Sequence, residues 1–593
     1  MQNHLPAGPV PVEASAGPLR DLGYTGAVQL TAGPLADRLG HAAQVYGGLS
    51  LDSVLKGFRE RAGLPAPGDG LKGWSRETTE PTFGQWVSGL ARLSRVLGDP
   101  ALAARAVDLV EGYAATLPAS GATGMGIYGW EKLVCGLVDL AAYAGYGDGL
   151  TLLSKIVQAE DFDESRRVPT GNDFGGAGPA FTPEWYTLPE NLYQGYLASG
   201  DEVLAEYARR WHYDAYWDRF LTRPERGQRW DVPVWLHAYS HVNTLASAGA
   251  VYDVTHDPRY LTILANAHDF MTGTQVYATS GYGPMELTVP DDGTLGRALE
   301  WRNDTAEIVC GTWAVFKLGS KLITETGEAR YLRWAENLLW NGLHTVTPVQ
   351  PNGLSPYYSD YRLGWARKLP YWEEWPCCSG TYVQAVAHIP DLVYHAADDG
   401  ITVSLFVPSR VQWQEGDQTV TLEQRTGLPE TSQTELRIGT GRPAEFTLRA
   451  RLPEWSDHTT VEVNGEPVLR TAQSGQWAVL RREWQDGDTV RLRFDCALRA
   501  EPVDSFHPSR VALAFGPVVL AQDASWAAPF SAPVPWEMDE WESFLKRKGD
   551  SLVFDAVTPG TARMATGSFR PLYEVPENVP YRVYHDLDRP RII

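Results

Sequence analysis

Two adjacent cysteines, Cys377 and Cys378, stand in the segment W-P-C-C-S-G at residues 375–380 of a chain that has only five cysteines. A disulfide between neighbours in sequence is disfavoured, because its geometry fits badly across a single peptide unit. A cysteine that is ionised can bind a metal or act as a nucleophile. The pair therefore marks a candidate site for metal binding or nucleophilic chemistry.

A second candidate segment lies upstream, in D-T-A-E-I-V-C-G-T-W at residues 304–313. Its continuation, A-V-F-K-L-G, predicts a helix, on which Glu307 and Cys310 would point the same way at a spacing of three. With Cys377 and Cys378 they make one carboxylate and three thiolates, a set that suits tetrahedral zinc. Zinc would draw thiolates from the cysteines near neutral pH and leave one sulfur nucleophilic.

The cysteines also have a simpler interpretation. Free cysteines are often buried and serve as small hydrophobic side chains. The residue types and their spacing leave both interpretations open, the metal site and plain packing. Cys135, in L-V-C-G-L-V, and Cys496, on an alternating segment, are expected to serve packing alone.

The elements that would position these residues change character once along the chain. From about residue 20 to 395 the apolar residues follow helical spacing, as they do over 83–97 and 311–323. Short turns with an acidic residue separate the helical stretches, so that each turn ends one helix and caps or charges the start of the next. Five such turns, unevenly spaced, predict an irregular α/α toroid. They lie at 97–100, 146–149, 199–202, 255–258 and 326–329.

After Asp399 the apolar period changes to two. Residues 446–452 alternate between apolar and polar, and V-E-V-N-G-E-P-V at 461–468 predicts a hairpin that turns at Asn-Gly. This part of the chain is therefore predicted to be a β-sandwich. The predicted domains are a helical catalytic domain with an N-terminal extension over 1–395, a β-sandwich over 396–505 and a C-terminal β region over 506–593 that completes it or adds a second sandwich.

Composition excludes several classes of partner. Fifty-one Lys and Arg against 73 Asp and Glu give a net charge of −22, which repels nucleic acid and anionic membrane surfaces. We find no apolar run of membrane-spanning length and no signal peptide at the N-terminus, and therefore expect a cytoplasmic location. Few cysteines, odd in number, favour reduced thiols or a metal site over a disulfide framework.

Several longer motifs resemble glycoside hydrolase family 127, the β-L-arabinofuranosidase family, which is related to family 146. They are G-P-L-A-D-R-L-G-H, V-L-K-G-F-R-E-R-A-G, S-H-V-N-T (240–244), T-S-G-Y-G-P-M-E (279–286), P-C-C-S-G, L-R-A-R-L-P-E-W and A-L-A-F-G-P-V-V-L-A. The resemblance covers most of the chain. It implies an (α/α)6 toroid or barrel followed by β-sandwich domains. It also implies a retaining exo-glycosidase that removes a terminal furanosyl residue, in the first place β-L-arabinofuranose, from an oligosaccharide or other glycoside. A homodimer is compatible with such an enzyme.

The resemblance assigns roles to individual residues. Cys377 is the expected nucleophile and Glu286, which closes G-Y-G-P-M-E, the expected acid/base. His241 and Tyr358 are expected to contact the sugar. The residue types alone also allow His241 as a hydrogen-bonded core histidine and Glu286 as an exposed carboxylate of a glycine-rich loop. Thiolate attack on the anomeric carbon and protonation of the leaving oxygen would give a thioglycosyl intermediate, which water then releases with retained configuration. The implied cofactor is Zn2+, and its ligands would be Glu307, Cys310, Cys377 and Cys378.

The chain departs from the family pattern at three places. Its Glu-x-x-Cys replaces a usual Glu-x-Cys, which on a helix turns one ligand by about 100°. Glu131, before Lys132, stands where the family often has His-Lys. Glu190 stands where a second sugar-facing histidine is common. Glu131 and Glu190 are therefore expected to alter the hydrogen bonds to sugar hydroxyls and with them the substrate, unless they only complement helix dipoles.

Two other functions remain open at this level. A carboxylate-based glycosidase with a structural zinc would pair Glu286 with Glu131, Glu190 or Glu374, and it predicts that Cys377→Ser retains activity. A non-catalytic protein that binds carbohydrate through its β-sandwiches predicts sugar binding without turnover.

Overall fold

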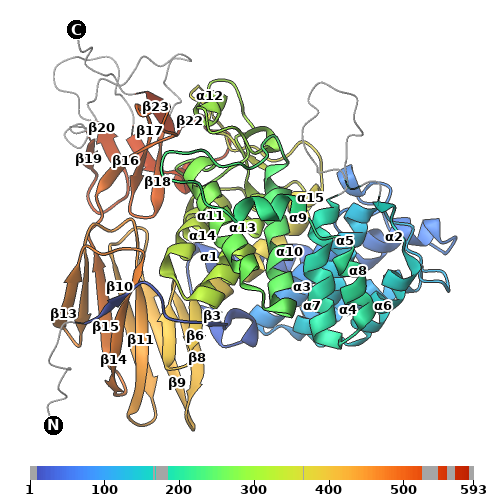
Figure 1. Cartoon of the computed structure of the whole chain (residues 1–593), viewed down its shortest axis with the longest axis horizontal. Helices are drawn as coiled ribbons and strands as arrows, with labels where there is room; N and C mark the ends of the chain where they lie inside the picture. The colour runs from blue at the N-terminus through green and yellow to red at the C-terminus, as the bar shows by residue number, and fades with distance from the viewer. Residues whose placement is uncertain are drawn as a thin grey trace.

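The computed structural model describes residues 10–164, 167, 184–364, 366–523, 545–556 and 568–586. Figure 1 shows a helical body on one side of the molecule and β-sheets on the other. None of the described helices is both long and apolar enough to cross a membrane.

Among the described residues, six helices form a closed inner ring in the helical body. Each contacts the next in chain order, and the last, α15, contacts the first, α3. The inner helices are apolar on most faces because neighbours cover them all round; all 12 residues of α15 are buried. This ring confirms the predicted (α/α)6 fold. Its members are α3 (Phe83–Leu97), α5 (Ile127–Ala144), α7 (Leu188–Ser199), α10 (Ala238–Thr255), α13 (Ile308–Thr326) and α15 (Cys377–His388).

The acidic turns that the sequence predicts connect inner helices to outer ones. Gly98 ends α3 in the left-handed region at φ 65°, and Asp99 caps α4 by accepting the N–H of Ala101 at 2.9 Å. At the fourth of these turns, residues 255–258, His256 takes the left-handed conformation in place of glycine, and Asp257 caps α11. The outer helices are α1 (Pro34–Gly47), α2 (Leu51–Arg61), α4 (Pro100–Ala114), α6 (Asp148–Ala159), α8 (Glu202–Arg209), α11 (Pro258–Thr274) and α14 (Leu332–Leu338).

Two sheets make the predicted sandwich after the helical body. The order is β1-β14-β11-β7-β6-β2 in one and β13-β12-β15-β10-β9-β8-β3 in the other. The predicted hairpin joins β12 (Thr459–Val463) to β13 (Glu466–Thr471), with Asn464 at φ 52° and Gly465 at φ 85°. The remaining strands are β6 (Tyr394–Ala397), β7 (Gly400–Val403), β8 (Ser409–Glu415), β9 (Gln418–Thr426), β10 (Gln433–Thr440), β11 (Ala444–Leu452), β14 (Gln476–Trp484) and β15 (Thr489–Phe494).

The N-terminal segment contributes edge strands to this sandwich. The strands are β1 (Val12–Glu13), β2 (Arg20–Asp21) and β3 (Val28–Leu30). β1 and β2 pair at opposite ends of one sheet, and β3 closes an edge of the other. The N-terminal extension therefore ties the sandwich to the helical body, which the sequence alone did not indicate.

A third sheet follows the sandwich and packs beside the helical body. Its path runs β16-β17-β18-β21-β20-β19, with β22 on β18 and β23 on β17. The strands are β16 (Leu498–Pro502), β17 (Arg510–Phe515), β18 (Val518–Asp523), β19 (Leu545–Arg547), β20 (Phe554–Ala556), β21 (Ser568–Pro571), β22 (Tyr581–Arg582) and β23 (Tyr584–Asp586).

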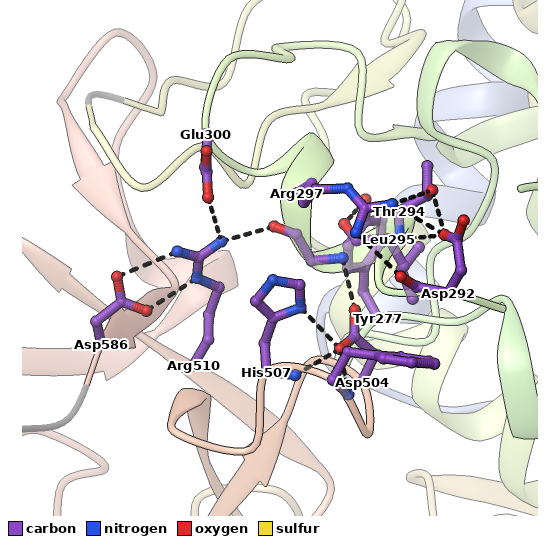
Figure 2. Close-up of polar contacts among 12 residues, drawn as sticks. Tyr277, Asp292, Thr294, Leu295, Arg297, Glu300, Asp504, His507, Arg510 and Asp586 are labelled. Atoms are coloured by element: carbon purple, nitrogen blue, oxygen red, sulfur yellow. Dashed lines mark hydrogen bonds and ion pairs between the residues drawn. The ribbon is translucent and has the colours of Figure 1, made fainter. Parts of the chain in front are cut away.

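This C-terminal sheet holds a long loop of the helical body, residues 277–304, which we call the Glu286 loop. Arg510 of β17 donates to Glu300 Oε1 at 3.1 Å and to the carbonyl of Gly296 at 2.8 Å (Figure 2). Asp504 accepts the N–H of Gly296 at 2.7 Å, in the short helix α12 (Thr294–Ala298). The loop is therefore fixed by groups more than 200 residues away in sequence.

Apolar contacts extend the same interface. Tyr277 of the Glu286 loop and Tyr361 belong to one buried cluster with Tyr584 and other side chains of the C-terminal sheet. The Tyr584 hydroxyl accepts the N–H of Ala278 at 2.8 Å, and the Tyr581 hydroxyl donates to the carbonyl of Asp360 at 2.8 Å. The C-terminal sheet thus supports two loops of the helical body at once.

Candidate active site

The three predicted sulfur ligands and the predicted carboxylate lie together in the buried interior. Cys310 Sγ is 3.3 Å from Cys378 Sγ and 3.9 Å from Cys377 Sγ, and Cys378 Sγ is 3.7 Å from Glu307 Oε1. One candidate ligand atom from each of the four residues lies within 4.8 Å of all the others. Zn–S bonds of about 2.3 Å at tetrahedral angles would place the sulfurs about 3.8 Å apart. The spacing of this cluster therefore fits tetrahedral zinc.

The cluster stands at the N-terminal ends of two inner helices. Cys377 and Cys378 open α15 directly after Pro376, and Cys310 is in the first turn of α13. The partial positive charge at helix N-termini favours thiolates, and it does so here from two helices at once. The helix ends thus position the sulfurs and also stabilise negative charge on them.

Glu307 corrects one premise of the sequence analysis. It is not helical but precedes α13 in extended conformation, at φ −78° and ψ 93°. It belongs to a short strand, β4 (Ala306–Glu307), that pairs with β5 (Tyr358–Ser359). The 100° rotation expected for Glu-x-x-Cys on a helix does not apply, because the backbone turns between Glu307 and Cys310. Glu307 Oε2 is buried without a hydrogen bond in the described structure, which suits a metal ligand.

The three thiols do not share negative charge equally. Burial raises the pKa of Cys310 and of Cys378. Hydrogen bonds from Cys310 and Cys378 lower the pKa of Cys377, although burial opposes them. The negative charge of the cluster is therefore most stable on Cys377. Burial, and then the charges of Glu286 and Cys377, raise the pKa of Glu307.

Glu286 faces this cluster from the Glu286 loop. Its backbone and that of Met285 are both left-handed, at φ 62° and 61°, a costly conformation for residues other than glycine. Its Oε1 accepts a hydrogen bond from the Tyr358 hydroxyl, and its Oε2 lies 3.3 Å from His237 Nε2. Burial favours a higher pKa for Glu286, but His237 and two tyrosine hydroxyls outweigh it and lower the pKa. This set of donors thus favours the ionised form of the carboxylate.

Two tyrosines connect the thiol to the carboxylate. Tyr357 has its hydroxyl 3.6 Å from Cys377 Sγ and its ring 4.5 Å from that of Tyr358. Tyr358, one of the predicted sugar contacts, donates to Glu286 and lies in β5 opposite Glu307. The structure therefore brings Tyr358 to the site and adds Tyr357, which the sequence analysis did not single out.

His237 is a site residue that the sequence analysis missed. Its Nε2 is 3.3 Å from Glu286 and 3.6 Å from Glu307, and its Nδ1 is 3.4 Å from Glu184. Burial opposes its protonation, but hydrogen bonds to Glu184 and Glu286 raise its pKa well above the ordinary value. A cationic His237 therefore joins the two carboxylates that face the sulfurs.

The predicted histidine, His241, lies one turn further along α10. Its ring is fully buried among Tyr186, Tyr213 and Tyr216, and its Nδ1 donates to the carbonyl of His237 at 2.9 Å. Burial lowers the pKa of His241 to about 3. Of the two histidines in H-A-Y-S-H, residues 237–241, only His237 stands at the start of α10, where it reaches Glu286 and Glu307.

The remaining two predicted sugar contacts take different positions. Glu131 is buried on α5 and pairs with Lys132 at 2.9 Å, and Lys132 lies 3.8 Å from Glu184. Glu131 is thus connected to the site through Lys132 and Glu184. Glu190 pairs with Lys317 at 2.5 Å and lines a separate cavity of about 730 Å³ with residues from the C-terminal halves of the inner helices.

Comparison with known proteins identifies the domains. The family model for "Beta-L-arabinofuranosidase, GH127 catalytic domain" matches residues 27–391, and that for the GH127 middle domain matches 400–496. Sequence comparison with curated proteins finds no match.

Solved structures share the architecture. A GH127 β-arabinofuranosidase is 18% identical, with a TM-score of 0.70 over 97% of this chain and 98% of its own. The GH127 β-L-arabinofuranosidase of Geobacillus stearothermophilus T6 is 17% identical, with a TM-score of 0.69 over 95% of this chain and 100% of its own. At these identities the likeness establishes the fold.

Proposed function

The chain belongs to the GH127 β-L-arabinofuranosidase family and is a glycoside hydrolase, and from this premise we propose that it removes terminal β-L-arabinofuranosyl residues with retention of configuration. Cys377 is the proposed nucleophile and Glu286 the proposed acid/base. The observation that carries the proposal is the position of Glu307, which lies in two clusters, one with the three sulfurs and one with His237 and Glu286. The nucleophile and the acid/base are therefore neighbours across one carboxylate.

The residues of the chain suit each step of this reaction. Cys377, as the thiolate, attacks the anomeric carbon, and Glu286, in its protonated form, gives its proton to the departing oxygen. The thioglycosyl bond forms as the glycosidic bond breaks. Glu286, returned to its ionised form, then takes a proton from water, which displaces Cys377 from the sugar.

Glu307, Cys310, Cys377 and Cys378 are the proposed ligands of Zn2+, and the sulfur distances support this assignment. When bound, the metal supplies positive charge that keeps Cys377 ionised near neutral pH and improves it as a leaving group. His237 and Tyr358 orient Glu286, and the pair Glu184 and Lys132 orients His237.

The test is zinc content together with turnover of 4-nitrophenyl β-L-arabinofuranoside, in the wild type, Cys378→Ser and Cys496→Ser. Cys496 lies outside the cluster and is only partly buried, so its variant controls for loss of a thiol. We expect one zinc per chain in the wild type and in Cys496→Ser, and loss of zinc and of activity in Cys378→Ser. A wild type that turns over the substrate without zinc would contradict the metal-thiolate mechanism and favour the carboxylate mechanism. A wild type that binds the sugar without turnover would contradict the proposed hydrolysis.

A further inference from the structure

Trp372 has the most exposed large hydrophobic side chain of the described residues, with 73% of its surface accessible. Tryptophan is highly buried on average in folded proteins. The indole nevertheless packs against a neighbouring ring, that of Tyr371, with the centroids 3.8 Å apart and the planes inclined by 35°. An ordered, open aromatic face of this kind is suited to a ligand.

The exposed ring is the outer end of a row that reaches the candidate nucleophile. Tyr371 stacks in turn on Tyr357, with centroids 4.5 Å apart and planes inclined by 23°. The Tyr357 hydroxyl lies 3.6 Å from Cys377 Sγ, and only 5% of this tyrosine is exposed. The row Trp372, Tyr371 and Tyr357, which we call the aromatic row, therefore runs from solvent to the thiol.

The inner end of the aromatic row lies where a leaving group would depart. Tyr357 contacts Tyr358, the hydroxyl of which donates to Glu286. In the proposed reaction Glu286 protonates the leaving oxygen, so the leaving group extends away from Cys377 on the side of Glu286. Tyr371, the next ring of the row, also lies near this side of the site, with its ring centroid 6.4 Å from that of Tyr358.

Resting on the proposed function, we propose that Trp372 and Tyr371 form a leaving-group subsite that binds a neutral saccharide. Aromatic ring faces cover the apolar C–H face of a sugar ring at little entropic cost. The enzyme would then act on a terminal arabinofuranosyl residue linked to another sugar, and the stacked sugar would be the group that leaves.

The charges beside the aromatic row decide among possible ligands. Glu373 and Glu374 follow Trp372 directly and are half-buried, and neither forms a salt bridge with the described residues. Carboxylates accept hydrogen bonds from sugar hydroxyls but repel a uronate, in a chain whose net charge is already −22. A plain aryl group would stack equally well but offers no hydroxyl to these acceptors, so the position favours a neutral saccharide.

The test compares leaving groups within one variant. Trp372→Ala is assayed with methyl β-L-arabinofuranoside, the 4-nitrophenyl glycoside and a β-L-arabinofuranosyl disaccharide. We expect kcat/KM to fall about 3- to 10-fold for the disaccharide, the size of one aromatic stacking contact, and to stay unchanged for the methyl glycoside, which is too small to reach the ring. Phe506→Ala, at an aromatic side chain 47% exposed on the C-terminal region, controls for loss of a surface ring.

Each other outcome would contradict the proposed leaving-group subsite. An equal loss with the methyl glycoside and the disaccharide would mean that Trp372 acts on the structure of the site. No loss with the disaccharide would mean that the exposed face binds no leaving group. A loss confined to the 4-nitrophenyl glycoside would assign the face to aromatic aglycones. If the wild type hydrolyses none of the three, the proposed function itself fails, which is a separate result.

Discussion

The sulfur half of the site and the carboxylate half are built in different ways. Cys310, Cys377 and Cys378 stand in the first turns of inner helices, where the ring of the barrel fixes them. Glu286 stands on the Glu286 loop, where its own backbone is in the left-handed region. The C-terminal sheet supports this loop through Arg510 and other residues. One half depends on local helix geometry, and the other depends on contacts between domains.

Exposure and charge follow the same division. The sulfurs are buried almost completely, while the Glu286 side chain is 27% exposed. Such burial suits a metal site, in which the geometry of the ligands must not change. The carboxylate half is open to solvent, and in the proposed reaction it exchanges protons with the leaving group and with water.

Replacement of the nucleophile should have the largest effect. Cys377→Ser should lower kcat by about four orders of magnitude or more, because the hydroxyl is neutral at the pH where the thiol is ionised. The assay is turnover of the 4-nitrophenyl glycoside, with Cys496→Ser as the matched control. Activity of Cys377→Ser within tenfold of the wild type would rule out the cysteine mechanism.

Replacement of the acid/base should come next, and its effect should depend on the leaving group. Glu286→Gln should lower kcat/KM by about 10²- to 10⁴-fold for a saccharide leaving group, which needs protonation. The loss should be much smaller for a 2,4-dinitrophenyl glycoside, which leaves without a proton. A loss of the same size for both substrates would show that Glu286 is not the acid.

The link between the two halves can be tested through pH. His237 lowers the pKa of Glu286, and the acid step needs Glu286 protonated. His237→Gln should therefore raise this pKa, so that kcat/KM falls at a higher pH on the alkaline side than in the wild type. A pH profile that only loses height, with an unmoved alkaline limb, would mean that His237 does not control the charge of Glu286.

Loosening the support of the carboxylate half should have the smallest effect. Arg510→Met removes contacts to Gly296 and Glu300 and should lower kcat about tenfold by misplacing the Glu286 loop, while zinc content stays the same. Arg449→Met is the control, since Arg449 makes a bidentate pair with Asp399 in the sandwich, as Arg510 does with Asp586 in the C-terminal sheet. If both variants lose thermal stability and kcat equally, the interface has no specific role in catalysis.

The sulfur half was within reach of the sequence because its signals are local. Adjacent cysteines, a third cysteine that opens a helical stretch and acidic turns between helices all reflect backbone geometry over a few residues. The helical ring and the sandwich followed from apolar periods for the same reason. The sequence misplaced Glu307 on a helix, because its pairing with Tyr358 joins residues 51 positions apart.

The carboxylate half was harder to predict. The sequence does not distinguish His237 from His241 as a site residue. His237 reaches Glu286 because it directly precedes α10, whereas His241 lies one turn inside that helix. Glu190 was expected near the sugar, but its place along α7 sets it against Lys317. The support from Arg510 depends on tertiary packing, which no local pattern encodes.

The most direct test of the account is to find the residue that carries the sugar. Glu286→Gln, mixed with 2,4-dinitrophenyl β-L-arabinofuranoside and quenched with acid within milliseconds, should accumulate the glycosyl enzyme, because the variant lacks the base for its hydrolysis. Peptide mapping by mass spectrometry should place the pentosyl group on Cys377. A pentosyl group on a carboxylate, with Cys377 unmodified, would contradict the central claim.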